Sequence, residues 1–122
     1  MAAQLAELRA QPPLLRDDFR RDDDTWPTTA DENVTYAYVR RAYHIRVNTA
    51  NWLGYAFNQQ LSDRRLLNFL AEVDVGHVAG PLNAEYGILF HYRDGDNFYL
   101  YAISGLGTYS LWRKAGGQWT SL

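Results

Sequence analysis

The sequence has 122 residues, of which 47% are hydrophobic, which is enough for one compact core and too little for two ordinary domains. Fourteen acidic and twelve basic side chains leave a formal net charge of -2, which excludes the basic excess that general nucleic-acid binding needs. The absence of cysteine excludes disulfides and thiolate metal sites, and the three histidines are too scattered for a zinc site.

The sequence carries no sign of membrane insertion or export. No apolar run approaches the roughly 20 residues that a membrane-spanning helix needs. The start of the chain includes Glu7 and Arg9, where a secretory signal peptide needs an unbroken apolar stretch. The sequence as it stands therefore predicts a soluble chain with no membrane span and no signal peptide, and it leaves the localisation open.

The first predicted element is a short helix over residues 2–10. This stretch is rich in alanine and leucine and places Leu5 and Leu8 on one helical face. It ends before Pro12 and Pro13, which cannot continue a helix.

A β domain is predicted to follow this helix. Residues 1–13 are interpreted as a leader, with a plain linker as the alternative, and residues 14–122 as one domain of short apolar runs broken by Asp, Asn, Gly and Pro. Apolar and polar residues alternate over residues 43–48, which predicts a strand with one buried face. A similar alternation predicts a long strand over residues 67–75. The apolar positions of these two strands are Tyr43, Ile45, Val47, Leu67, Phe69, Ala71, Val73 and Val75.

The end of the chain has the pattern of consecutive hairpins. Asp-Gly and Gly-Gly pairs supply the positive φ angles that tight hairpin turns require, and aromatic and β-branched residues fill the intervals between them. Successive strands are therefore expected to be antiparallel neighbours in one sheet. The predicted strands cover residues 86–93, 97–104, 108–114 and 118–122, with turns at Asp94-Gly95, through Gly105 and Gly107, and at Gly116-Gly117.

Several short motifs occur in order between Leu14 and Leu122. They are Asp17-Asp18-Phe19 followed by Trp26, Tyr43-His44-Ile45-Arg46-Val47 leading to Trp52, and Tyr86-Gly87-Ile88-Leu89-Phe90-His91-Tyr92-Arg93-Asp94 with Asn97-Phe98-Tyr99. Together they resemble the concanavalin A-like lectin/glucanase superfamily, in particular its bacterial laminin-G-like and keto-disaccharide-hydrolase-like domains. The resemblance implies an antiparallel jelly-roll β-sandwich, often with a sugar-binding concave face, and relatives that are often extracytoplasmic.

The end of the sequence departs from this family. Such domains usually continue past a strand like that over residues 118–122, with further strands that close the sandwich. The sequence stops at Leu122, so we expect either that the chain is a fragment or that a partner covers the open edge. A homodimer is one hypothesis for that partner.

Two alternating carboxylates suggest a catalytic site, but the third carboxylate that the family's enzymes carry is missing. The family's glucanases carry three carboxylates along one strand, and retaining hydrolysis needs two of them, one as nucleophile and one as general acid. The resemblance places Glu72 and Asp74 at the first two of these positions, but Gly76 stands at the third. Polar residues on a solvated strand face are the alternative reading. No catalytic residue is therefore assigned, and the enzyme hypothesis is not favoured.

Sugar binding needs fewer features than hydrolysis. A flat aromatic ring stacks on the apolar face of a pyranose, and polar side chains nearby bind its hydroxyls. Aromatic rings also fill sandwich interiors, so core packing remains the alternative for each of them. The candidate ligand-binding residues are Asp74, His91, Arg93, Tyr99, Tyr101 and Trp112.

One predicted turn contains the oxygen-bearing side chains of a conceivable calcium site. Asp94, Asp96 and Asn97 lie together there, but calcium takes six to eight oxygen ligands and hairpin geometry alone explains these residue types. We therefore expect no cofactor, with calcium as the alternative.

Two functions from different classes remain open. The first is a non-catalytic carbohydrate-binding, lectin-like module, whose partner is a glycan. The second is a protein-interaction or oligomerisation domain that uses the sandwich edge or an aromatic patch and has no sugar site. A glycoside-processing enzyme is a third, less favoured reading.

Overall fold

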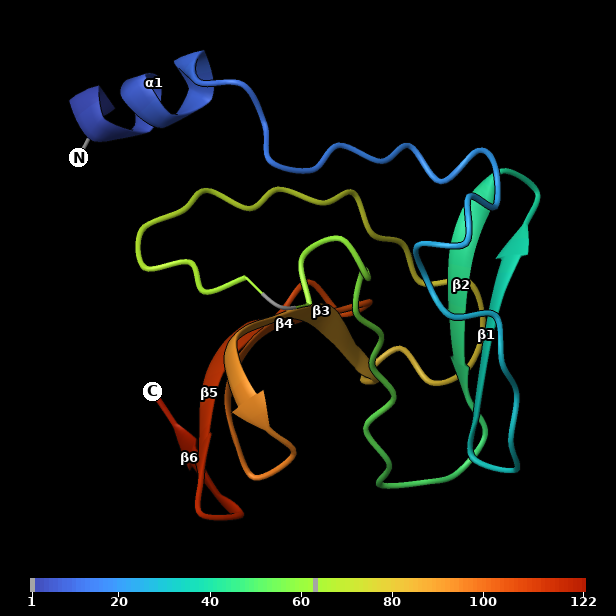
Figure 1. Ribbon diagram of the computed structural model, residues 1–122. Helices are drawn as coiled ribbons and strands as arrows, with labels where there is room; N and C mark the ends of the chain where they lie inside the picture. Colours follow the sequence, from blue (N-terminus) through green and yellow to red (C-terminus); the bar gives the residue numbers. More distant parts are fainter. Residues whose placement is uncertain (1, 63) are drawn as a thin grey trace. The chain divides into compact units, whose positions relative to one another are not determined.

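The computed structural model describes residues 2–62 and 64–122 (Figure 1). In these residues the strands form two antiparallel sheets, one of two strands and one of four, and a short helix precedes them. The chain divides into two compact units, Met1–Arg65 and Leu66–Leu122, which we call the N-terminal and C-terminal units. The prediction of an antiparallel all-β class is confirmed at this level.

The helix α1 spans Ala2–Ala10, as the sequence predicts. Alanine, leucine, glutamate and arginine are strong helix formers, and the prolines that follow end the helix. None of its residues is buried, so it contributes no side chain to a core. Within the described part of the chain, no helix has the length and apolar character needed to cross a membrane.

The N-terminal unit contains a hairpin of β1 (Val34–Val39) and β2 (Ala42–Val47). Strand β2 confirms the prediction over residues 43–48, whereas β1 was not predicted. The buried face expected for β2 is wrong, because Ile45 and Val47 are 46% and 43% exposed. The turn between the strands consists of Arg40 and Arg41, which lack the usual sequence signature of a tight turn.

Aromatic side chains hold the loop before β1 against β2 in the N-terminal unit. The ring of Trp26 lies 5.5 Å from those of Phe19 and Tyr43, and its Nε1 donates a hydrogen bond of 3.0 Å to Asp17 Oδ2. The Tyr43 hydroxyl donates to the Pro27 carbonyl at 2.7 Å. These contacts give the loop its tertiary anchor.

The C-terminal unit is a four-stranded antiparallel meander, drawn in brown to red in Figure 1. All four predicted strands are confirmed, with each boundary within one residue of its predicted place. The turn between the first two strands consists of Gly95 and Asp96, one residue later than predicted. The strands are β3 (Glu85–Asp94), β4 (Asn97–Ser104), β5 (Tyr109–Ala115) and β6 (Gln118–Ser121).

The two faces of this sheet differ in side chains. On one, which we call the Phe98 face, Phe98 and Ala102 are 2% and 1% exposed and form the core. Lys114 lies across that face, 5.6 Å from the Phe98 ring and 5.4 Å from the Trp119 ring. The opposite face, which we call the Tyr101 face, carries the alternate residues of β4 and their cross-strand neighbours. These are Tyr86, Ile88, Phe90, Tyr99, Tyr101, Ile103, Tyr109, Leu111 and Arg113.

The long strand predicted over residues 67–75 is wrong. This segment belongs to no sheet, and its apolar residues are largely exposed, with Leu67 at 85% and Val73 at 43%. Alternation of apolar and polar residues produces a strand only where another strand pairs its backbone, and no described strand does so here. The segment instead lies beside the Tyr101 face, where Phe69 packs edge-on against His91 at 5.6 Å.

Candidate functional site

An open cavity of about 560 Å³ lies in the C-terminal unit. We call it the Tyr101 cavity. One side is built by the segment over residues 71–75, and the other by β3 and β4. Its lining residues are Ala71, Glu72, Val73, Asp74, Val75, Gly87, Ile88, Tyr101 and Ile103.

Strand pairing explains how β3 and β4 supply the floor of the Tyr101 cavity. Ile88 of β3 pairs with Tyr101 of β4, and Ile103 follows on the same face of the sheet. Glycine is required at position 87 of β3, because a Cβ there would collide with the backbone of Tyr101 and Ala102 in β4. The absence of that side chain lets β3 lie close against β4 beneath the cavity.

The Tyr101 cavity combines an apolar floor with acidic side chains. Tyr101 is 44% exposed, so part of its ring is open to solvent. Glu72 and Asp74 line the same cavity, and both residues are exposed. An accessible ring can stack on the apolar face of a sugar while carboxylates accept hydrogen bonds from its hydroxyls.

The structure brings together two of the six predicted ligand-binding residues at this cavity, Asp74 and Tyr101. Tyr99 lies on the same face as Tyr101, but its ring stacks on Phe90 at 5.4 Å. His91 packs edge-on against Tyr99 at 6.2 Å and does not line the cavity.

The other two predicted residues lie elsewhere. Trp112 pairs with Leu100 on the Phe98 face, where its Nε1 donates to Ser110 Oγ at 2.9 Å and its ring lies 6.2 Å from Trp119. Arg93 is exposed near the end of β3. A bulge between Phe90 and Asp94 interrupts the regular alternation of β3 in the stretch that contains His91 and Arg93.

Sequence reasoning missed the apolar part of the site. Ile88 and Ile103 line the cavity but were not candidate residues. Their position on the same face as Tyr101 follows from the register of β3 and β4, which the hairpin pattern does not specify by itself. Glu72 lies two residues before Asp74 in the same apolar/polar alternation, and that spacing is the sequence signal that places both residues on one side of the segment.

The carboxylate series considered for hydrolysis is incomplete in the structure as well. Glu72 and Asp74 line the cavity, but Gly76 supplies no side chain, and a Cβ added at Gly76 would have open space for 4 Å around it. The series therefore ends at two carboxylates.

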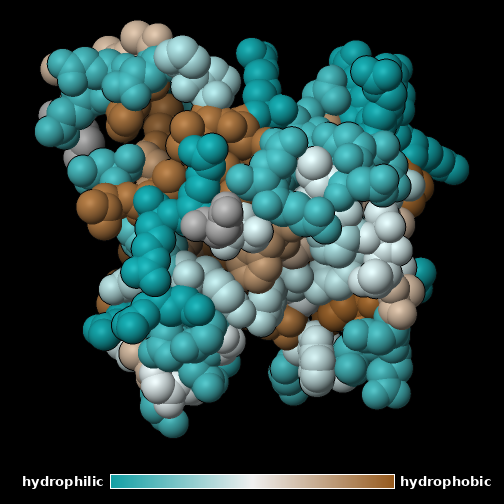
Figure 2. Space-filling model, in the orientation of Figure 1, coloured by the Kyte–Doolittle hydropathy of each residue, from teal (hydrophilic) through white to brown (hydrophobic). Residues whose placement is uncertain are grey.

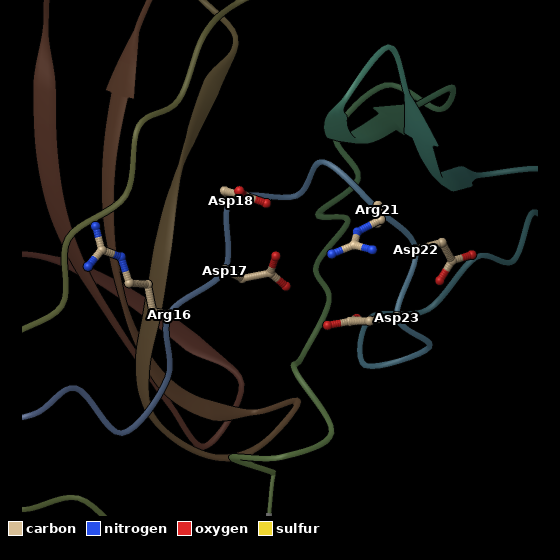
Figure 3. A pocket seen from close by; sticks show the side chains of 6 residues that line it. All are labelled: Arg16, Asp17, Asp18, Arg21, Asp22 and Asp23. Carbon is tan, nitrogen blue, oxygen red and sulfur yellow. The ribbon is translucent and has the colours of Figure 1, made fainter.

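A second cavity, of about 470 Å³, lies along the loop before β1 in the N-terminal unit (Figure 3). Several of its carboxylates accept hydrogen bonds from the same loop. Asp17 Oδ1 accepts the Phe19 amide at 2.8 Å, and Asp22 Oδ1 accepts the Asp24 amide at 2.9 Å. The Thr25 hydroxyl and amide lower the pKa of Asp23. Its lining residues are Arg16, Asp17, Asp18, Arg21, Asp22 and Asp23.

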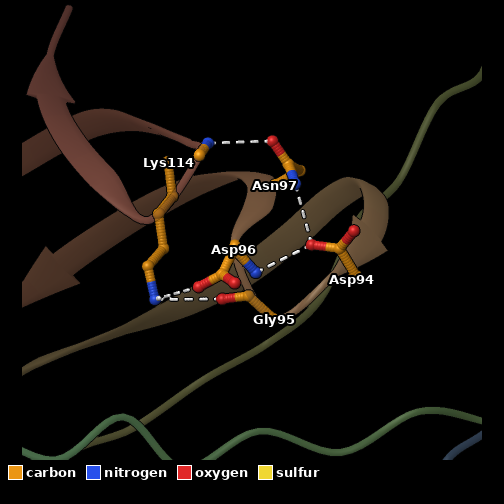
Figure 4. A network of polar contacts seen from close by, with 6 residues as sticks. Asp94, Gly95, Asp96, Asn97 and Lys114 are labelled. Atoms are coloured by element: carbon orange, nitrogen blue, oxygen red, sulfur yellow. Dashed lines mark hydrogen bonds and ion pairs between the residues drawn. The ribbon is translucent and has the colours of Figure 1, made fainter.

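The acidic turn considered for calcium is held by hydrogen bonds (Figure 4). Asp94 Oδ1 accepts the Asn97 side-chain amide at 2.9 Å and the Asp96 backbone amide at 2.8 Å, and both bonds lower the pKa of Asp94. Lys114 Nζ donates to the Gly95 carbonyl at 2.9 Å. Among the described residues, no group of three or more His, Asp or Glu side chains is arranged to hold a metal ion.

No protein-family model, curated protein or solved structure matches the chain. The resemblance to the concanavalin A-like superfamily therefore stays a prediction.

Proposed function

We propose that the chain is a non-catalytic carbohydrate-binding module and that the Tyr101 cavity holds the sugar. The observation that carries the proposal is the meeting of Asp74 and Tyr101 at one cavity. The two residues belong to different segments, and each was a candidate for sugar binding on chemical grounds alone. The ring provides a stacking surface and the carboxylate accepts hydroxyl hydrogen bonds.

The proposal includes the finer architecture that the family resemblance implies. We propose that the two antiparallel sheets belong to a jelly-roll β-sandwich of the concanavalin A-like type. The support is the order of the motifs along the sequence, together with the all-β content of the described residues.

A glycan array followed by titration calorimetry tests the binding function. Tyr101→Ala is expected to reduce affinity for the bound glycan about tenfold or more, a loss similar to the roughly 1 to 3 kcal/mol that alanine substitution costs where a nucleobase stacks on an aromatic side chain. Tyr101→Phe keeps the ring and should keep most of the affinity. Trp52→Ala, which removes a ring 50% exposed in the N-terminal unit, is the matched control.

The thermal stability of these variants separates binding from packing. If Tyr101→Ala lowers the free energy of unfolding by as much as it weakens the free energy of glycan binding, Tyr101 acts as a core residue and the proposed site is wrong. Failure of the unmodified chain to bind any glycan would contradict the function itself.

A protein-interaction or oligomerisation domain is the second candidate, and exposed apolar surface favours it. Hydrophobic patches interrupt the hydrophilic surface in Figure 2. Large apolar residues of the C-terminal unit are well exposed, and β3 and β6 each pair on one side only among the described strands. The most exposed are Leu67 at 85%, Val78 at 78%, Tyr109 at 76%, Leu122 at 63% and Leu106 at 61%.

Sedimentation over a range of concentrations distinguishes the two candidates. Self-association together with no glycan binding would support the assembly function, in which a homodimer covers an open sheet edge. A stable monomer at high concentration would contradict the homodimer.

A further inference from the structure

The ionisable side chains that line the Tyr101 cavity are Glu72, Asp74 and Tyr101, and all the other lining residues are apolar or glycine. No lysine, arginine or histidine of the described residues lines it. Arg113 lies on the same face of the sheet, opposite Tyr99, and is not part of the lining. Lys114 points to the other face and donates to the Gly95 carbonyl. Asp74 therefore meets no cationic side chain in the lining of this cavity.

An acidic cavity with an exposed aromatic ring distinguishes between classes of sugar. A protonated amino group donates charge-assisted hydrogen bonds to a carboxylate, which are stronger than those of a neutral hydroxyl. The face of a tyrosine ring also attracts a cation. An N-acetyl group carries no charge, and the carboxylate of a uronic acid would face carboxylates of the same sign.

We infer that the Tyr101 cavity selects carbohydrates with a free, protonated amino group, such as glucosamine oligomers, over neutral and acidic ones. The inference rests on the proposed sugar-binding function and adds the substrate class. Tyr101 and the apolar floor hold the pyranose ring, and Asp74 receives the ammonium group.

Titration calorimetry on the full chain tests this preference with four matched trisaccharides, made of glucosamine, N-acetylglucosamine, glucose and galacturonate. The buffer is weakly acidic and low in salt, so that the sugar amines are protonated. The glucosamine trisaccharide should bind about tenfold or more tightly than the neutral ones, as expected for a hydrogen bond between charged groups. The galacturonate trisaccharide should bind most weakly.

Two charge-removing variants locate the source of the preference. Asp74→Asn should abolish most of the preference for glucosamine, because the charge is removed and the shape is kept. The amide oxygen still accepts a hydroxyl hydrogen bond, so the affinity for the glucose trisaccharide should fall by a smaller factor. Glu32→Gln removes an exposed carboxylate of the N-terminal unit and should leave the preference unchanged. Circular dichroism confirms that both variants are folded.

Each contrary result has a distinct meaning. Equal binding of glucosamine and glucose trisaccharides, or tightest binding of galacturonate, would overturn the amino-sugar inference while leaving sugar binding intact. Equal loss of preference in Asp74→Asn and Glu32→Gln would overturn it too, because the attraction would then come from overall charge. Binding of none of the four sugars, together with an empty glycan array, would contradict the proposed function itself.

Discussion

The two units turn their hairpins with different residues. The β1–β2 turn uses Arg40 and Arg41, at φ angles of 50° and 64°, whereas the β5–β6 turn uses Gly116 and Gly117, at 56° and 79°. The left-handed conformation is free of side-chain strain for glycine but costs other residues about 1 kcal/mol each. Pairing of the flanking strands therefore imposes the same turn on both sequences. Only the Gly116-Gly117 pair has a sequence signature from which the turn can be predicted.

The units also differ in what they bury. In the C-terminal unit Phe98 is 2% exposed beneath Lys114 and Trp119. In the N-terminal unit the buried apolar residue is Val34, at 4%. Because Phe98 is a large ring and Val34 a small side chain, truncating Phe98 is expected to lower the free energy of unfolding more than truncating Val34.

The largest expected effect is that of Phe98→Ala. Removing a buried ring leaves a cavity and should lower the free energy of unfolding of the C-terminal unit by about 3 to 5 kcal/mol. Urea unfolding followed by tryptophan fluorescence measures the loss. Tyr109→Ala, which removes an aromatic residue 76% exposed on the same sheet, should change it by less than about 0.5 kcal/mol. Similar losses in both variants would contradict the placement of the core.

A smaller loss is expected for Gly87→Ala. The added methyl would collide with the backbone of β4, which should cost about 1 to 3 kcal/mol and disturb the floor of the Tyr101 cavity. Gly76→Ala is the matched control, because the methyl added there would meet nothing within 4 Å. Equal stability of the two variants by urea unfolding would show that β3 and β4 do not approach as closely as described.

The hairpin comparison predicts opposite signs for reciprocal substitutions. Arg40→Gly should raise the free energy of unfolding by about 0.5 to 1 kcal/mol, because glycine adopts a positive φ without strain. Gly116→Arg should lower it by about 1 kcal/mol, since it introduces that strain at the equivalent turn position. Thermal unfolding measures both, and shifts of the same sign would show that the turn conformation does not control stability.

The last effect is confined to alkaline pH and to the N-terminal unit. Burial of its hydroxyl, with a contribution from nearby carboxylates, raises the pKa of Tyr38 to about 12. In the unfolded state tyrosine has its ordinary pKa of about 10. Between these values the unfolded state releases the proton first, so stability present below about pH 10 is lost as the pH rises toward 12.

Urea unfolding at a series of alkaline pH values measures this loss. Tyr38→Phe removes the ionising group and should make the decline shallower. Burial also raises the pKa of Tyr43, so some decline should remain in that variant. An unchanged slope in Tyr38→Phe would contradict the assignment.

The candidate site was only partly predictable. Asp74 and Tyr101 were chosen for their chemistry, and the structure places both at one cavity, but Trp112 packs on the other face of the sheet. Residue type identifies groups able to bind a sugar. The face that each group occupies depends on strand register and bulges, such as the bulge after Phe90, which local patterns do not specify.

The sequence by itself determined the helix Ala2–Ala10 and the four strands between Glu85 and Ser121, because prolines, glycines and short apolar runs act locally. The tertiary structure alone decided three further features. It formed β1 across an arginine turn, left residues 67–75 without a strand partner, and brought Asp74 to Tyr101. None of these is specified by a local pattern, because a backbone becomes a strand only where another strand pairs with it, and two side chains become a site only where the fold brings them together.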